Sequence, residues 1–574
     1  MRRILIVIAL AFATPAFAAN DVSAAWISRL PAIDYVWDSA NPRVEGWPAE
    51  GSSVTWQGHI RNLGDSDVTI DYQWRLDGHV ERRGVVTIAA GALATVDFPW
   101  TWTFARHRLQ LELDPANELV ETEERNNDLL VYTDSIAAGF WIEQSVWDYL
   151  RGRLPQLHAG VASFDDWIQL RMRMFNDMAA VAIYPETPDG VLDRMRVEKI
   201  VVVPDGTLPL GVLQNPQGND LAGQAVHFPD PNDRTIDLEW GYPVKPSLAS
   251  LQHFNDEAFF DDSLLHELGH ARYLVDVYGW YVLDAPPLHV VDLDVPRQNA
   301  QVHDVSEHGL MVQHYTFLDR YSAAALNRIA GARATRGHYN EPENLGSFLN
   351  DLPAQNRVTF VDAQGRPLAN RQVKIYQATA PSGHYDGTNS PYGKHYDNNA
   401  DLTVQTDANG AALVGRNPFS HGAIVHTNDF SNVTAIMRAG DQYGFLESLD
   451  FNLAWWRGEQ ELANHTVVVG GPNCAVSLQP FVTSPNHESI VATNRVTLTW
   501  SRSTMPGTTY TLFVSEDDQK PRVAGTTTAT TFTATLGGDV QWWVEAKYPN
   551  GCVERSDTGR FSAPRAPRRR AVRP

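Results

Sequence analysis

The sequence predicts a multidomain protein in which one α+β domain is flanked by all-β sandwich modules. Its 574 residues are too many for one hydrophobic core, because single cores stop growing beyond about 250–300 residues. Apolar and polar residues alternate with a period of two before residue 136 and after residue 355, as in half-buried strands. Between these limits the apolar residues have helical spacing, mixed with short strand-like runs.

Composition and charge limit the classes of function. Apolar residues make up 43% of the chain and charged residues 20%, which is typical of globular proteins. The formal net charge of −22 argues against nucleic acid as a partner, because phosphate binding needs a basic surface. No run of 18 uninterrupted apolar residues occurs, so we expect no integral membrane segment. We expect a monomer.

The first 18 residues have the pattern of a Sec-type signal peptide. Two arginines precede an apolar run too short to span a bilayer, and a small-x-small cleavage site follows it. These features are Arg2, Arg3, residues 4–13 and residues 16–18. We therefore expect a mature protein that begins near Ala19 and is exported, either to the periplasm or out of the cell. An uncleaved anchor is the alternative.

Residues 20–135 are predicted to form a β-sandwich. Alternating runs at 53–60 and 68–74 are bounded by Asn/Asp/Gly turn signals, and the segment ends with an acidic run that closes at Asn126 and Asn127. This ending resembles the CARDB family, Ig-like adhesion modules of bacterial surface proteins. The resemblance implies contact with a cell surface or an extracellular matrix. The carboxylates of the run have two interpretations, a Ca2+ site or a solvated acidic turn, and we favour the solvated turn.

Residues 136–350 are predicted to form the α+β domain. Four segments have helical spacing of large apolar side chains, and two short apolar runs between Pro, Gly and Asp predict buried strands. The predicted helices are 140–154, 164–178, 256–273 and 322–330, and the predicted strands are 200–203 and 235–240. Helices and strands mixed in this way are typical of an α+β domain.

Two further β modules are predicted after this domain. Residues 355–470 resemble the prealbumin-like or Ig-like domains appended to many secreted bacterial enzymes, with a strand–turn–strand pattern at 358–368 that repeats at 404–413. Residues 473–563 resemble a fibronectin type III domain. Its expected strands include 496–500, 509–514 and 541–546. Residues 564–574 are basic and Pro-rich, and we expect them to be disordered.

The chain has two cysteines, Cys474 and Cys552, and both lie in the fibronectin-like segment. Two cysteines in an exported chain most often pair, so we predict a structural disulfide. Two buried free thiols are the alternative. Neither cysteine lies near residues 266–270, the candidate metal-binding motif described next, so cysteine catalysis has no support. The sequence also has no G-x-S-x-G elbow, P-loop or G-x-G-x-x-G motif.

Residues 266–270 read His-Glu-Leu-Gly-His within a run of helical character. Positions i and i+4 share one face of a helix, so His266 and His270 can bind one metal ion, and zinc accepts imidazole nitrogen. Glu267 is placed to take a proton from a zinc-bound water that attacks a peptide carbonyl, and to pass it to the leaving amine. Gly269 in a helix interior indicates close packing there. We therefore predict one catalytic Zn2+, with two surface histidines on an ordinary helix as the alternative.

The residues after this motif resemble the HExxHxxGxxD arrangement of the snapalysin and immune-inhibitor-A-like peptidases, which are of metzincin type. The resemblance implies a zincin-type fold for the central domain and Asp276 as the third zinc ligand. Tyr273 departs from the family pattern, which has a glycine that turns the chain back to the metal, and a Tyr with positive φ is strained. In a continued helix, Asp276 would lie about 120° from the histidine face. The alternative third ligands are His289, His303, Glu307 and His308.

Residues 307–312 resemble the Met-turn of the metzincin clan, in which a methionine forms an apolar floor beneath the metal. The resemblance assigns this structural role to Met311, although a methionine after a glycine is also an ordinary core residue. Tyr278 and Tyr315 are candidates to donate a hydrogen bond to the oxyanion. Packed aromatic side chains are the alternative for both.

Together these features predict a secreted zinc-dependent endopeptidase that acts on proteins or peptides. The alternative is a surface adhesion or binding protein whose central domain is inactive or holds zinc structurally, since β modules of this kind usually bind. A third hypothesis is a zinc hydrolase that acts on a non-protein amide, such as cell-wall peptide. Modules and peptidase are compatible, so we favour the enzyme.

Overall fold

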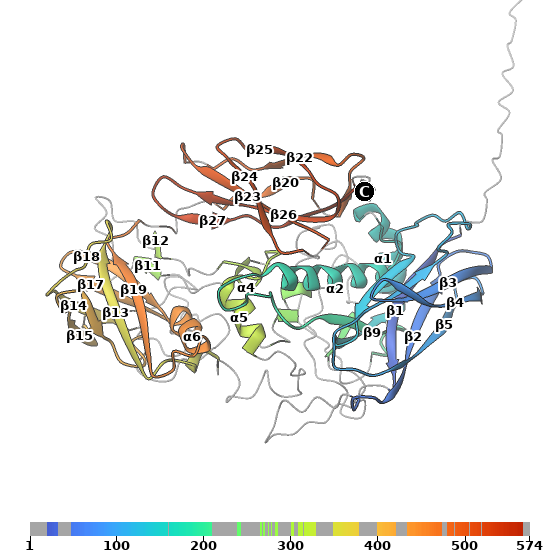
Figure 1. The fold of residues 1–574 in the computed structure, drawn as a ribbon, viewed down its shortest axis with the longest axis horizontal. Coiled ribbons are helices and arrows are strands. Elements are labelled where there is room, and N and C mark those ends of the chain that lie inside the picture. Colours follow the sequence, from blue (N-terminus) through green and yellow to red (C-terminus); the bar gives the residue numbers. More distant parts are fainter. Residues whose placement is uncertain are drawn as a thin grey trace, which may run out of the picture.

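The structure is a computed structural model. It describes residues 20–31, 48–158, 160–208, 238–242, 264–266, 268–269, 272, 274, 277, 282–284, 300–303, 308–313, 315–328, 348–377, 396, 399–420, 433–472, 474, 479–486, 488–503, 505–517 and 519–565. The predicted signal peptide and nearly all of the predicted disordered tail lie outside these residues. The described part is a multidomain, mostly β assembly (Figure 1).

The N-terminal module is a β-sandwich, as predicted. One sheet has the order β1-β2-β5, and the other has the order β4-β3-β6-β7. The strands are β1 (Val22–Leu30), β2 (Ser53–Asn62), β3 (Val68–Leu76), β4 (His79–Ile88), β5 (Leu93–Thr101), β6 (Arg108–Leu113) and β7 (Asp128–Tyr132). Trp56, Trp74 and Trp102 fill the space between the sheets and are almost completely buried. Aromatic side chains bury a large apolar area each, so these three residues dominate the core of the sandwich.

A parallel three-stranded sheet organises the central domain. Its order is β10-β8-β9, with β8 (Ile136–Glu143) in the middle, β9 (Met195–Val203) and β10 (Leu238–Tyr242) at the edges. Helices α1 (Gln144–Leu157) and α2 (Phe164–Val181) connect β8 to β9. The helix predicted for 140–154 is wrong in its first turn, because residues 140–143 belong to β8. A parallel strand buried on both faces has a continuous apolar run, which does not differ from a buried helix in its periodicity.

The rest of the central domain consists of short elements. Residues 264–266 and 268–269 are helical, within the range predicted for the helix at 256–273. The other elements are β11 (Val282–Asp284) and β12 (Ala300–His303), which pair antiparallel, α4 (Leu310–Gln313), α5 (Arg320–Arg328) and the 3-10 turn η2 (Phe348–Asn350). Helix α5 corresponds to the helix predicted at 322–330.

The third module also has two sheets, with the orders β16-β13-β19 and β15-β14-β17-β18. Its elements are β13 (Gln355–Asp362), β14 (Gln372–Tyr376), β15 (Leu402–Gln405), β16 (Ala411–Leu413), β17 (Thr434–Ala439), β18 (Gln442–Glu447), α6 (Ser448–Trp456) and β19 (Leu462–Val469). The strand–turn–strand pattern predicted at 404–413 is present as β15, a turn and β16, but the two strands do not pair as a hairpin, since β15 pairs with β14 and β16 pairs with β13. Between these two strands, the hydroxyl of Thr406 accepts a hydrogen bond from the amide of Arg371, which precedes β14.

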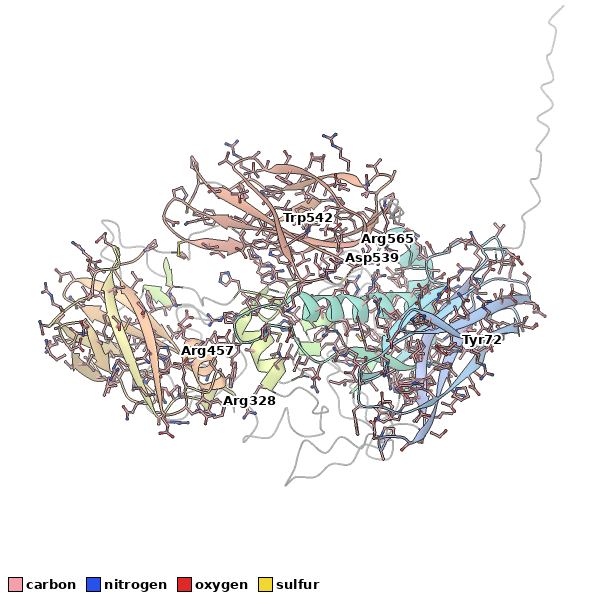
Figure 2. All side chains as sticks on the ribbon, in the orientation of Figure 1. Tyr72, Arg328, Arg457, Asp539, Trp542 and Arg565 are labelled. Atoms are coloured by element: carbon pink, nitrogen blue, oxygen red, sulfur yellow. A yellow bond between two sulfur atoms is a disulfide. The ribbon has the colours of Figure 1, made fainter. Side chains whose placement is uncertain are left out.

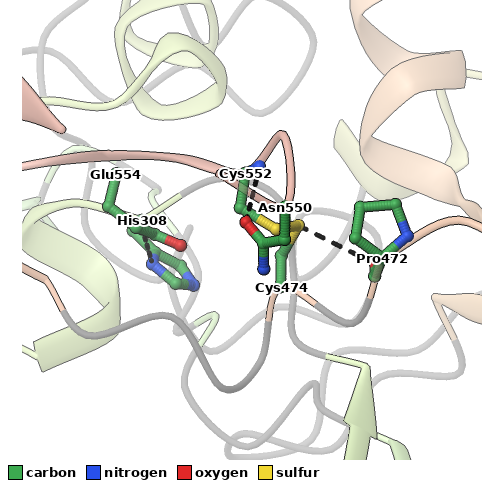
Figure 3. Close-up of a disulfide and its surroundings, with 6 residues drawn as sticks. All are labelled: His308, Pro472, Cys474, Asn550, Cys552 and Glu554. Carbon is green, nitrogen blue, oxygen red and sulfur yellow. Dashed lines mark hydrogen bonds and ion pairs between the residues drawn. A yellow bond between two sulfur atoms is a disulfide. The ribbon is translucent and has the colours of Figure 1, made fainter. Parts of the chain in front are cut away.

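The C-terminal module is a fibronectin-like sandwich, and the strands predicted at 496–500, 509–514 and 541–546 are confirmed. One sheet has the order β20-β22-β25 and the other β21-β28-β26-β23-β24, with β27 paired to β26. The strands are β20 (Val482–Ser484), β21 (Ser489–Ile490), β22 (Arg495–Trp500), β23 (Thr509–Glu516), β24 (Arg522–Thr527), β25 (Thr531–Thr535), β26 (Gly538–Lys547), β27 (Val553–Arg555) and β28 (Gly559–Ala563). Trp542 lies in its core (Figure 2). The predicted disulfide between Cys474 and Cys552 is confirmed (Figure 3).

All three β modules pack on the central domain. The C-terminal module lies along α2, and the other two modules lie at opposite ends of the assembly (Figure 1). Arg457, labelled in Figure 2, follows α6 and donates to Glu186 of the central domain, which also accepts from Arg320. No helix within the described ranges is long and apolar enough to cross a membrane.

The disulfide should stabilise the C-terminal module. Replacing Cys474 and Cys552 together by Ser should lower its free energy of unfolding by about 2–4 kcal/mol, because the bond closes a long loop in the unfolded chain. The two cysteines are 78 residues apart in the sequence. Urea unfolding followed by circular dichroism measures the change. The parent protein under reducing conditions is the control and should match the double variant; equal stability of the oxidised and reduced parent would contradict the role.

Candidate metal centre

His266 is the best-defined member of the predicted site. It follows Leu264 and Leu265 in a helical segment, and it is only 3% exposed. Its Nδ1 lies 2.9 Å from the carbonyl oxygen of Leu310. A carbonyl oxygen can only accept, so Nδ1 must carry the proton and Nε2 becomes the acceptor nitrogen of the neutral ring. Metal-binding histidines typically have this arrangement, because the hydrogen bond fixes the tautomer and the orientation of the ring.

The helix that carries His266 ends soon after it. The amide of Arg272 donates to the carbonyls of Leu268 and Gly269, at 3.1 and 3.0 Å, and the amide of Leu274 also returns to Gly269, at 3.0 Å. A continuing α-helix would direct the Leu274 amide to residue 270 instead, because each amide bonds four residues back. The chain therefore leaves the helix after Arg272.

Met311 packs directly against the helix at Gly269. A Cβ atom at Gly269 would lie 2.7 Å from the sulfur of Met311, so the absence of a side chain is what permits the contact. Main-chain hydrogen bonds also hold Met311 and its neighbour Leu310 in place. The amide of Val277 donates to the Met311 carbonyl at 3.0 Å, and the amide of Leu310 donates to the Phe317 carbonyl at 2.9 Å. Helix α4 and the residues next to it, 308–309 and 315–318, are called the α4 segment. This segment thus contacts both the helix that carries His266 and the chain that follows that helix.

Several predicted site residues lie outside the described part of the chain. They are Glu267, His270, Asp276, Tyr278, His289 and Glu307. Within the described part, no group of three His, Cys, Asp or Glu side chains is arranged to hold a metal ion. What the structure establishes is the position of His266 and of the residues packed around it.

Two alternative third ligands contact carboxylates of the flanking modules. His303, on β12, has its Nε2 2.6 Å from Glu447 of the third module, and its ring stacks on Phe445 at a centroid distance of 4.1 Å. His308 has its Nδ1 3.3 Å from Glu554 of the C-terminal module (Figure 3).

Tyr315, a candidate oxyanion donor, is partly buried at the end of the α4 segment. Its ring lies nearly parallel to that of Phe317, with a centroid distance of 6.0 Å and an interplanar angle of 7°. This contact fits the packed-aromatic alternative for the ring and leaves the role of its hydroxyl as a prediction.

The acidic run of the N-terminal module is not simply a solvated turn. Glu121 accepts hydrogen bonds from the amide of Val22, at 2.6 Å, and from the side chain of Asn127, at 2.8 Å. Asn126 donates to Asp21 at 3.2 Å and to Asp166 of α2 at 3.4 Å. The run therefore closes the junction between the N-terminal module and the central domain.

Burial raises the pKa values of the carboxyl groups at this junction. Desolvation raises the pKa of Asp21 to about 6, of Glu121 to about 7 and of Asp166 to about 7. Sequence analysis missed Asp21 and the pair Asp165–Asp166 as members of this cluster. The available signal was the sequence Ser163-x-x-Asp166, which forms the capping box of α2.

Replacing Asp21 by Asn should make stability less dependent on pH. The folded pKa of Asp21 lies above its unfolded value of about 3.9. Its contribution to stability is therefore fully present below about pH 4 and is lost as the pH rises through about 6. The variant should melt at a higher temperature than the parent at pH 7–8, and the difference should vanish near pH 4. Thermal unfolding across this range measures it.

The matched control for this experiment is Asp65→Asn. Asp65 lies in the same module, in an exposed turn, and should show no such difference. A constant offset between Asp21→Asn and the parent from pH 4 to 8 would contradict the assignment.

Comparison with known proteins identifies one module. No curated protein is significantly similar to the chain. A CARDB domain from Pyrococcus furiosus, in complex with di-metal ions, is 19% identical over 20% of this chain and 94% of that chain, with a TM-score of 0.16. A human fibronectin type III domain is 16% identical over 18% and 94%, with a TM-score of 0.14. A tandem-repeat segment of a large adhesion protein is 11% identical over 37% and 50%, with a TM-score of 0.13. Residues 39–131 match the CARDB family, and the N-terminal module is therefore a CARDB domain.

Proposed function

We propose that the protein is an exported zinc-dependent endopeptidase whose metal is held by His266, His270 and Asp276. The single observation that carries the proposal is the hydrogen bond from His266 Nδ1 to the Leu310 carbonyl. A buried imidazole in this tautomer offers Nε2 as an acceptor, and such an orientation is what a zinc ligand requires. His270 follows four residues later in the sequence, a spacing that puts two side chains on one face of an α-helix.

Imidazole and carboxylate are side-chain types that zinc accepts as ligands, and a bound zinc would supply a Lewis acid that lowers the pKa of a coordinated water to about 7. The proposed role of Glu267 is to accept the proton of the attacking water and to deliver it to the leaving amine. Tyr315 and Tyr278 are the proposed donors to the oxyanion, where a hydrogen bond stabilises the developing charge. Met311 is the proposed apolar floor, in keeping with its contact at Gly269.

Asp276 remains the preferred third ligand. The end of the helix at Arg272 and the hydrogen bond from the Val277 amide to the Met311 carbonyl support this choice. Val277 follows Asp276 in the sequence. Its amide donates to Met311, the residue that packs against the His266 helix at Gly269. A carboxylate from a segment held there completes a ligand set of two imidazoles and one carboxylate, which catalytic zinc sites use.

A second candidate function is adhesion or surface binding with an inactive central domain. The CARDB domain and the two further β modules favour it, because modules of this kind usually bind other surfaces. The two functions differ in one assay. Hydrolysis of casein that is abolished by a chelator and restored by Zn2+ supports the peptidase, whereas a metal-free protein without hydrolysis supports adhesion alone.

Replacing Glu267 by Gln should abolish proteolysis while zinc stays bound. Gln keeps the size of the side chain but cannot accept and return a proton. Casein hydrolysis should fall by at least about 100-fold, the lower range of a general-base contribution. Elemental analysis should give the zinc content of the parent, and parental activity in this variant would rule out the general-base role.

Replacing Asp276 by Ala should lower the zinc content, because the metal would lose one of its three protein ligands. Elemental analysis after dialysis measures the ratio of zinc to protein. The matched control is Asp65→Ala, which changes an exposed aspartate of the CARDB domain. This variant should have the same zinc content as the parent. An unchanged ratio for Asp276→Ala would mean that another residue is the third ligand.

A further inference from the structure

We infer that Arg555, in the C-terminal fibronectin-like module, is a positioning residue for the metal ligand His266. This inference rests on the proposed function, because it concerns the same metal site. It goes beyond that function by making a flanking module part of the catalytic unit. The link runs through two residues of the central domain, Phe317 and Leu310.

The first step is a cation–π sandwich between the two domains. The guanidinium of Arg555 lies 4.1 Å from the ring centroid of Phe317 and 4.2 Å from that of Trp543. Phe317 belongs to the central domain and is 3% exposed, and Trp543, on β26, is 5% exposed. Cation–π attraction strengthens when the partners are removed from water, so this contact fixes the position of Phe317.

The second step follows the main chain from Phe317 to the metal ligand. The Phe317 carbonyl accepts the amide of Leu310 at 2.9 Å. The Leu310 carbonyl in turn accepts Nδ1 of His266, also at 2.9 Å. Leu310 and His266 are both buried, so neither bond is weakened by competing water. A displacement of Phe317 would therefore be transmitted to the ring that presents Nε2.

Further contacts hold the residues on both sides of Phe317, one directly to the C-terminal module and one through Tyr184 of the central domain. Asp557 accepts from the amide of Thr316 at 3.1 Å and from its hydroxyl at 3.3 Å. The hydroxyl of Tyr184 donates to the Leu318 carbonyl at 2.8 Å and interacts with Arg555. Thr316 and Phe317 thus contact the C-terminal module directly, and Leu318 is linked to Arg555 through Tyr184.

The disulfide supports this arrangement from within the C-terminal module. Cys552 lies three residues before Arg555, and its bond to Cys474 ties the turn that begins β27 (Figure 3). In the same strand, Glu554 contacts His308, which stands two residues before Leu310. The strand that carries Arg555 is therefore held at the turn before it and contacts the α4 segment at a second point.

The test compares Arg555→Ala and Arg555→Lys with the parent, with Arg495→Ala as the matched control on an exposed position of β22. Zinc affinity is measured by competition with a chromophoric chelator, and ligand geometry by the visible spectrum of the Co2+-substituted protein. Arg555→Ala should bind zinc about tenfold more weakly and shift the Co2+ bands, since outer-shell groups typically change metal affinity by about 10–100-fold. Arg555→Lys keeps a cation between the rings and should recover most of the affinity. Arg495→Ala should match the parent.

A second variant keeps the inference testable if Arg555→Ala does not fold. Phe317→Leu removes the ring but leaves the carbonyl that accepts from Leu310, and it should weaken zinc binding similarly. The double variant should be no weaker than either single variant, because both break one contact. If folded Arg555→Ala or Phe317→Leu has the zinc affinity and the Co2+ spectrum of the parent, the inference is overturned and the proposed function still stands. A parent that binds no zinc would overturn the proposed function and this inference with it.

Discussion

The candidate site depends on the contact between the His266 helix and the α4 segment. Three interactions make this contact: His266 Nδ1 donates to the Leu310 carbonyl, the Met311 sulfur packs where Gly269 has no side chain, and the Val277 amide donates to the Met311 carbonyl. Two of them use main-chain carbonyls, which are fixed by the fold rather than by rotamers. The tautomer of a buried imidazole and the direction of the chain after the helix are thereby set by one short segment.

The β modules pack on the central domain, which carries this segment. Strand β1 of the N-terminal module is buried against the central domain, where Ser23 donates to Asp166 and the amide of Arg29 donates to Glu198 at 3.1 Å. The third module reaches the central domain through Arg457, and the C-terminal module through Arg555. Buried polar and charged contacts of this kind couple domains, because breaking one partner leaves the other unpaired in a dry interface.

Sequence analysis predicted the elements that depend on local pattern. The strands at 53–60 and 509–514 alternate with a period of two, and α2 has both an apolar stripe and a capping box. The errors arose where tertiary context decides: residues 140–142 are apolar on both faces of a buried strand, and β15 and β16, within 404–413, pair in different sheets.

Within the site, the sequence predicted that His266 and Met311 belong to the same metal centre. It could not identify Leu310 as the acceptor or Arg555 as a neighbour, since main-chain contacts and contacts between distant segments leave no motif. X-ray absorption at the zinc edge tests the central claim most directly. We expect one zinc per molecule with two imidazole ligands and oxygen donors at about 2.0–2.2 Å. A protein without zinc, or zinc without an imidazole shell, would contradict it.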